Sequence, residues 1–140
     1  MQSNAAVSKF AWEKLNVWTS LLNEGLSTID DQFVTQEFKQ LFLSQPDIEP
    51  ENNCFIARVA DVPAGILRVT NESQIERTVA NLYVVPKYRQ NGVGKQLLEK
   101  AIHRAHELRA QLLHIQVSVN NNPGRFLLEQ AGFAAVRRFW

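Results

Sequence analysis

Apolar residues recur at helical spacing near the start of the chain. Between Val7 and Glu24 they fall three or four positions apart, which predicts a helix over this segment. Gly25 is a natural stop for that helix, and no strand is expected within residues 1–10. The residues that form the apolar stripe are Ala11, Leu15, Trp18 and Leu22.

A second helix is predicted after Asp30 or Asp31, because either carboxylate can accept hydrogen bonds from the first free amides of a helix. Residues 45–53 contain two prolines and mostly polar side chains, so this segment is expected to form a loop. The apolar stripe of the second helix consists of Val34, Phe38, Leu41 and Phe42.

The middle of the chain changes to a pattern typical of strands. Residues 54–60, 66–70 and 78–85 are short apolar runs, and the first two are separated by residues 61–65, which contain the proline and glycine of a hairpin turn. The third run ends at Pro86, which has no amide to donate to a further ladder hydrogen bond. These three runs predict an antiparallel meander.

A long amphipathic helix is predicted after the glycine-rich turn that follows Pro86. Residues 113–119 then alternate as a strand, a short helix begins near Pro123 and ends at Gly132, and residues 133–140 are predicted to form a final strand. A strand–helix–strand unit beside a meander indicates a mixed α/β (α+β) domain around one sheet. The apolar face of the long helix consists of Val93, Leu97, Leu98, Ala101, Ile102, Ala105 and Leu108.

Composition narrows the class of protein. The 140 residues carry a net charge of +1, which does not favour nucleic-acid binding. No apolar run approaches the roughly 20 residues that a membrane-spanning helix needs. Cys54 is the single cysteine, so no internal disulfide can form, which fits a reducing compartment. One cytoplasmic domain over residues 1–140 is therefore expected.

The turn before the long helix carries the most specific chemistry. Gly92 and Gly94 remove side chains where the first amides of a helix and its dipole attract an anion. Arg89 and Lys95 add full positive charges at the rim. A pyrophosphate is the natural ligand for such a turn.

Two common phosphate-binding motifs do not match. A Walker P-loop needs glycine where Arg89 stands and Ser or Thr where Gln96 stands. A dinucleotide-binding fingerprint needs a small residue where Leu97 stands.

A third motif does match. The run Arg89-x-x-Gly92-x-Gly94 follows a strand that ends in Pro86, and Asn121-x-x-Gly124 precedes Gly132-Phe133. Together, in this order, the two signatures resemble those of the GCN5-related N-acetyltransferase (GNAT) superfamily. The resemblance implies the acyl-CoA N-acyltransferase fold, a mostly antiparallel sheet with one splayed parallel pair, flanked by helices.

The resemblance also implies a site for acetyl-CoA, the acyl donor, without any metal. The cofactor would lie in the splay between strands 78–85 and 113–119, which a β-bulge near Tyr83 commonly opens in relatives. Backbone of the first strand would pair with the pantetheine arm, the glycine turn would hold the pyrophosphate, and Asn121 would hold the pantetheine end or cap the next helix. The implied residues are Leu82, Tyr83, Val84, Arg89, Gln90, Asn91, Gly92, Val93, Gly94, Lys95 and Asn121.

The catalytic residues of relatives are replaced here. Leu128 stands where a tyrosine often protonates the leaving thiolate, and Thr78 stands where some relatives carry a glutamate base. Glu76, two residues earlier and on the same face of a strand, is the remaining base candidate.

The leading hypothesis is an N-acetyltransferase that moves acetyl from acetyl-CoA to a primary amine by direct attack in a ternary complex. The alternative is a catalytically silent acyl-CoA-binding module that regulates a partner protein. Polyamine, amino acid, antibiotic, peptide terminus and lysine side chain all remain open as acceptors.

Other residues have simpler interpretations. His103 and His106 lie on the polar side of the long helix, where solvated histidines are more frequent than metal ligands, and His114 has no visible partner. An apolar C-terminal end, with Trp140, suggests strand pairing between two copies, so a homodimer is hypothesised. The residues expected in the core are Trp12, Trp18, Phe33 and Phe38.

Overall fold

The computed structural model describes residues 5–26, 50–70, 75–89, 91–115 and 122–134. The second predicted helix and residues 135–140 of the last predicted strand lie outside these ranges. Phe133 and Ala134, where that strand was predicted to begin, are not in a strand.

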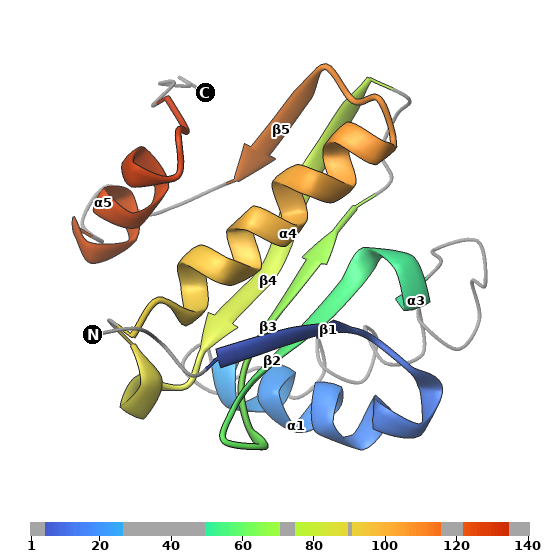
Figure 1. Cartoon of the computed structure of the whole chain (residues 1–140), viewed down its shortest axis with the longest axis vertical. Coiled ribbons are helices and arrows are strands. Elements are labelled where there is room, and N and C mark those ends of the chain that lie inside the picture. The colour runs from blue at the N-terminus through green and yellow to red at the C-terminus, as the bar shows by residue number, and fades with distance from the viewer. Residues whose placement is uncertain (1–4, 27–49, 71–74, 90, 116–121, 135–140) are drawn as a thin grey trace.

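The described residues form one five-stranded sheet in the order β1-β2-β3-β4-β5. The first four strands pair antiparallel, and β5 pairs parallel to β4 (Figure 1). The expected mixed α/β class, with one parallel pair at the end of a meander, is therefore confirmed. The strands are β1 Ala5–Lys9, β2 Cys54–Val59, β3 Val62–Val69, β4 Glu76–Val84 and β5 Leu112–Ile115.

The N-terminal segment differs from its prediction. β1 occupies residues expected to hold no strand, and the helix that was expected from Val7 begins only at Leu15, as α1 Leu15–Leu26, after a 3-10 turn at Trp12–Lys14. Val7 pairs with Ala57 of β2 and packs on the core from an alternating strand. The backbone hydrogen bonds that β1 makes with the open edge of β2 therefore outweigh the helical spacing of the apolar residues in this segment.

The remaining helices follow the predicted order. α4 Val93–Glu107 and α5 Asn122–Gln130 match the long and the short helix, and Pro86–Tyr88 form a 3-10 turn. The predicted loop 45–53 ends in one helical turn, α3 Pro50–Asn53, instead. The amide oxygen of Asn53 fixes that turn, because it accepts a hydrogen bond of 2.8 Å from Nε of Arg104 on α4.

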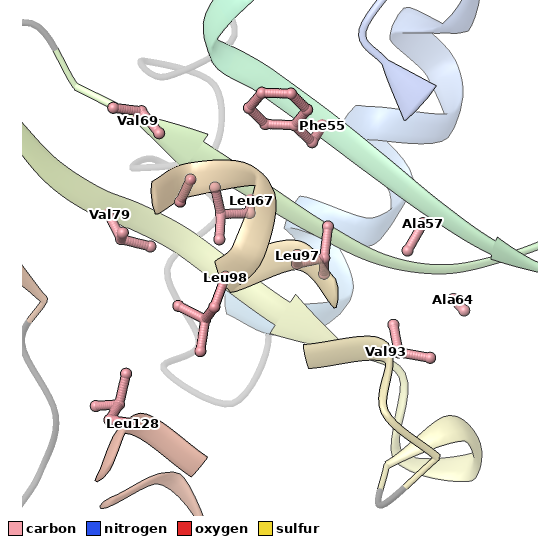
Figure 2. Close-up of a cluster of buried hydrophobic side chains, with 11 residues drawn as sticks. Phe55, Ala57, Ala64, Leu67, Val69, Val79, Val93, Leu97, Leu98 and Leu128 are labelled. Carbon is pink, nitrogen blue, oxygen red and sulfur yellow. The ribbon is translucent and has the colours of Figure 1, made fainter. Parts of the chain in front are cut away.

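Two hydrophobic clusters sandwich the sheet. Figure 2 shows the first, in which α4 packs Val93, Leu97 and Leu98 against the strands. The second lies on the opposite face, where α1 packs on β3 and β4. Its buried members are Phe10, Trp18, Leu21, Leu22, Cys54, Ile56 and Ile66.

Of the four aromatic residues expected in the core, two lie in the described part of the chain. Trp18 is fully buried, as predicted, whereas Trp12 is 40% exposed because its indole donates a hydrogen bond to Glu51 at the surface. Phe33 and Phe38 lie outside the described residues.

Burial raises the pKa of the Cys54 thiol, so this cysteine stays protonated and unreactive. Among the helices of the described ranges, none has both the length and the apolar character to cross a membrane.

Candidate functional site

A β-bulge interrupts β4 near Tyr83, as expected. Ile66 of β3 pairs with Tyr83, but Arg68, two residues further, pairs with Ala80. β4 therefore holds one extra residue in this interval, which bends the strand and changes its alternation. As a result Val79 and Leu82, three residues apart, both pack on the cluster beneath α4.

The described part of the parallel pair lies before this bulge. The register of β4 and β5 runs from Glu76 with Leu112 to Val79 with Ile115, while β4 continues to Val84. In the part of the chain that the structure describes, the backbone of residues 82–84 is thus next to no strand on the β5 side. The predicted splay itself stays a prediction, because residues 116–119 of its second strand lie outside the described residues.

The turn into α4 leaves its first amides without partners inside the helix. Gly92 is the N-cap, with a left-handed φ of 82° and no side-chain cap on the helix, and the amide of Gln96 donates to its carbonyl at 3.0 Å. The amides of Val93, Gly94 and Lys95 precede the first helical hydrogen bond. Because the neighbouring residues Asn91, Gly92 and Lys95 are exposed, this corner can receive an anion from solvent. Gln90 lies outside the described residues.

Two glycines near the turn are required by close packing. A Cβ on Gly94 would lie 2.9 Å from Cδ2 of Leu127 on α5 and 3.7 Å from Cγ2 of Val84. A Cβ on Gly65 of β3 would lie 2.9 Å from the carbonyl oxygen of Tyr83. Gly94 therefore has a structural role besides the one predicted. Gly65, which was expected in the hairpin turn of residues 61–65, lies instead in β3, where it keeps α4 close to the bulged strand.

Arg89 stabilises the end of β4. Its Nε donates a hydrogen bond of 2.9 Å to the carbonyl of Val84, and its guanidinium carbon lies 5.7 Å from the ring centre of Tyr83. The Tyr83 hydroxyl donates to Oε2 of Glu24 on α1 at 2.6 Å. Desolvation first, and then this hydrogen bond, raise the pKa of Tyr83 to about 12. The phenol is therefore protonated at neutral pH and acts as a donor, never as a base.

The base candidate, Glu76, has a neighbour that the sequence did not reveal. Its Oε2 lies 3.9 Å from Nε2 of His114 on β5, and that Nε2 is buried without a hydrogen-bond partner. His114 also pairs in register with Thr78, the position where some relatives carry a glutamate. The view that His114 has no partner is thus corrected, since parallel pairing brings residues 38 positions apart together.

The other chemistry-bearing residues lie elsewhere. Leu128 is buried in the core, so no donor replaces tyrosine at that position. His103 lies 4.0 Å from Glu107 on the exposed side of α4. Asn121 lies outside the described residues. Within those residues, no group of three or more His, Cys, Asp or Glu side chains is placed to hold a metal ion.

Comparison with known proteins agrees with this geometry. Residues 15–133 match the family model described as the acetyltransferase (GNAT) family. No curated protein sequence matches the chain.

Solved structures show the same fold at low sequence identity. The aminoglycoside N-acetyltransferase AAC(6')-Iy in complex with CoA has a TM-score of 0.77 at 18% identity, over 100% of this chain and 94% of that chain. A predicted acetyltransferase from Clostridium acetobutylicum with acetyl-CoA has a TM-score of 0.74 at 15% identity, over 97% and 94%. Naa50 from Arabidopsis thaliana, in complex with the bisubstrate analogue CoA-Ac-MVNAL, has a TM-score of 0.73 at 16% identity, over 96% and 85%.

Proposed function

Because this chain belongs to the acetyltransferase (GNAT) family, we propose that it transfers an acetyl group from acetyl-CoA to a primary amine by direct attack in a ternary complex. Family membership makes the chain an acetyl-CoA-dependent acetyltransferase. The amine acceptor, the ternary complex and the roles of single residues are the proposed part. The observation that carries the proposal is a helix start without a side-chain cap, at the exposed Gly92, beside the end of a bulged strand.

The residues present suit acetyl-CoA. The amides at Gly92 to Lys95, which precede the first helical hydrogen bond, would hold the pyrophosphate with the dipole of α4 behind them, and Lys95 would add a charge-assisted hydrogen bond. The free backbone of residues 82–84 would pair with the amides of the pantetheine arm. Arg89 would bind at the rim, although its Nε donates to the Val84 carbonyl in this structure. When bound, acetyl-CoA supplies an activated thioester.

The acceptor class rests on two further points. Solved relatives of the same fold are complexes with an analogue of an aminoglycoside and with the analogue CoA-Ac-MVNAL, so both small amines and peptide termini are reasonable acceptors. Glu76 lies on β4 beside the closed end of the splay, where a carboxylate helps to remove a proton from an amine.

The alternative, a silent acyl-CoA sensor, is favoured by one observation. Leu128 is part of the core and donates no proton to a leaving thiolate. Release of free thiol from acetyl-CoA, measured over polyamines, amino acids, aminoglycosides and peptides, separates the two functions. Turnover with any amine supports the enzyme. Calorimetric binding without thiol release across the panel supports the sensor, and absence of binding at millimolar acetyl-CoA contradicts both.

Lys95→Glu provides a test of the pyrophosphate site. Loss of one charge-assisted hydrogen bond, worth roughly 1.5–3 kcal/mol, should weaken acetyl-CoA binding about 10-fold or more, measured by calorimetry. The melting temperature should stay level or rise, because an acidic side chain in the first turn complements the helix dipole. Lys100→Glu, exposed on the same helix, makes the same change in net charge and should bind normally. Equal weakening in both variants would assign the effect to net charge.

Three wider expectations remain part of the proposal. They are a single domain over residues 1–140, a cytoplasmic location and a homodimer. Light scattering that shows only monomer at micromolar concentration would contradict the homodimer.

A further inference from the structure

We infer that His114 is the catalytic base that takes the proton from the attacking amine, and that Glu76 is the positioning residue that holds its imidazole. The inference rests on the proposed function, since it assigns the proton-transfer step of that reaction. Three observations support it: the face on which His114 lies, its place along the splay, and its contact with Glu76.

His114 lies on the side of the sheet opposite α4. Leu113 and Ile115, its neighbours on β5, pack on the cluster beneath α4, and successive residues of a strand point to opposite faces. The same alternation places Glu76 and Thr78 opposite Val79, which belongs to that cluster. Glu76, Thr78 and His114 therefore share one face.

Tyr83 extends this face toward the other end of β4. It packs on the cluster that contains α1, and its hydroxyl bonds Glu24 of α1. The side chain of His114 is 35% exposed on this face, so an amine on this side of the sheet can meet its imidazole. The opposite side of the sheet is covered by α4.

His114 also lies where the reacting end of the donor is directed. An arm with its phosphates at the start of α4 and its amides on residues 82–84 runs backwards along β4. Its sulfur end would then point toward Val79 and Ile115, the last pair of β4 and β5 among the described residues. His114 precedes Ile115 by one residue, which is about 3.3 Å along a strand.

The contact with Glu76 suits a base. Neutral imidazole accepts a proton near neutral pH, and a carboxylate nearby stabilises the imidazolium that forms. The Nε2 atom is buried, has no hydrogen-bond partner and lies 3.9 Å from Oε2 of Glu76. In the described ranges, β4 and α4 pack on β5. β4 places Glu76 on the same face of the sheet as His114. Arg77 of β4 and the charged residues of α4 lie on the α4 side of the sheet.

The step balances without a further reactant. The amine nitrogen forms a bond to the thioester carbonyl carbon, the carbon–sulfur bond breaks, and CoA leaves with the electron pair as a thiolate. The proton that the amine nitrogen loses goes to the imidazole of His114 and from there to solvent. The products are the N-acetylated amine and free CoA.

His114→Gln tests the assignment, because glutamine keeps polar atoms but accepts no proton at neutral pH. We expect kcat to fall roughly 100-fold or more, the rise of the rate between about pH 5 and 8 to disappear, and added imidazole to restore part of the rate. Acetyl-CoA affinity by calorimetry and the melting temperature should stay at wild-type values. His106→Gln, an exposed histidine on α4, serves as the matched control and should leave kcat unchanged.

Glu76→Gln separates the base from the residue that positions it. We expect a fall in kcat of about 10-fold with the KM for acetyl-CoA and the melting temperature unchanged, because the carboxylate stabilises the imidazolium that forms during the step. A larger loss in Glu76→Gln than in His114→Gln would make Glu76 the base instead. A kcat within twofold of wild type in His114→Gln, or a loss of acetyl-CoA binding with it, overturns the inference. Absence of turnover in the wild type contradicts the proposed function itself.

Discussion

Replacement of Gly94 by aspartate is expected to abolish the stabilisation that acetyl-CoA gives to the protein. The new Cβ would point between Leu127 of α5 and Val84 of β4, at the first turn of the helix proposed to hold the pyrophosphate. A carboxylate at this point repels the diphosphate and competes for the same amides. Loss of two charge-assisted hydrogen bonds, at roughly 1.5–3 kcal/mol each, corresponds to at least about 100-fold in affinity. The shift in melting temperature at millimolar acetyl-CoA should then vanish.

Asparagine at the same position is the matched control. It has the same size and branching as aspartate, so it also crowds the Leu127 side chain at 2.9 Å, but it carries no charge. We expect Gly94→Asn to lose only about 10-fold in affinity. Leu127→Ala added to Gly94→Asp removes the crowding and should leave binding weak. Recovery of binding in that double variant would show that packing against α5, and not charge, decides the effect.

Replacement of Gly65 by valine is expected to lower the free energy of unfolding by roughly 3 kcal/mol. The first added carbon would lie 2.9 Å from the Tyr83 carbonyl and 3.0 Å from Leu97 of α4. The carbonyl is backbone, so β4 or α4 must shift, and the melting temperature should fall by about 10 °C. The same shift moves the bulged strand against α4, so the KM for acetyl-CoA should rise.

Val62→Thr on the same strand is the control, since Val62 is 47% exposed and its change should leave both the melting temperature and the KM unaltered. Thermal unfolding and initial rates against acetyl-CoA concentration measure the two effects. A stable Gly65→Val protein with wild-type KM would show that this contact adapts without moving the site.

The turn into α4 was predictable from the sequence because its residues are contiguous. Gly92, Gly94 and Lys95 are local signals of a helix start, and the apolar face of α4 is periodic over its whole length. The meander and its parallel partner were likewise read from short runs, with bounds that shift by a few residues. These elements depend on local backbone chemistry, so the neighbouring residues are enough to predict them.

Predictions from neighbouring residues were wrong or missing where pairing between distant segments decides the local structure. Val7 has helical spacing with its neighbours, yet the edge of β2 draws it into β1. The local sequence predicts Gly65 in a hairpin turn, but it lies in β3, and the reason for a glycine there is a carbonyl 18 positions away.

The sequence by itself determined a glycine-rich helix start within one mixed sheet, since both follow from residues that are adjacent or periodic along the chain. Only the tertiary structure decided which ionisable groups surround the splay. Glu76 and His114 lie on different strands, and the parallel register of β4 and β5 places their side chains on one face. That register depends on the burial of both strands against α4, which is a property of the whole fold.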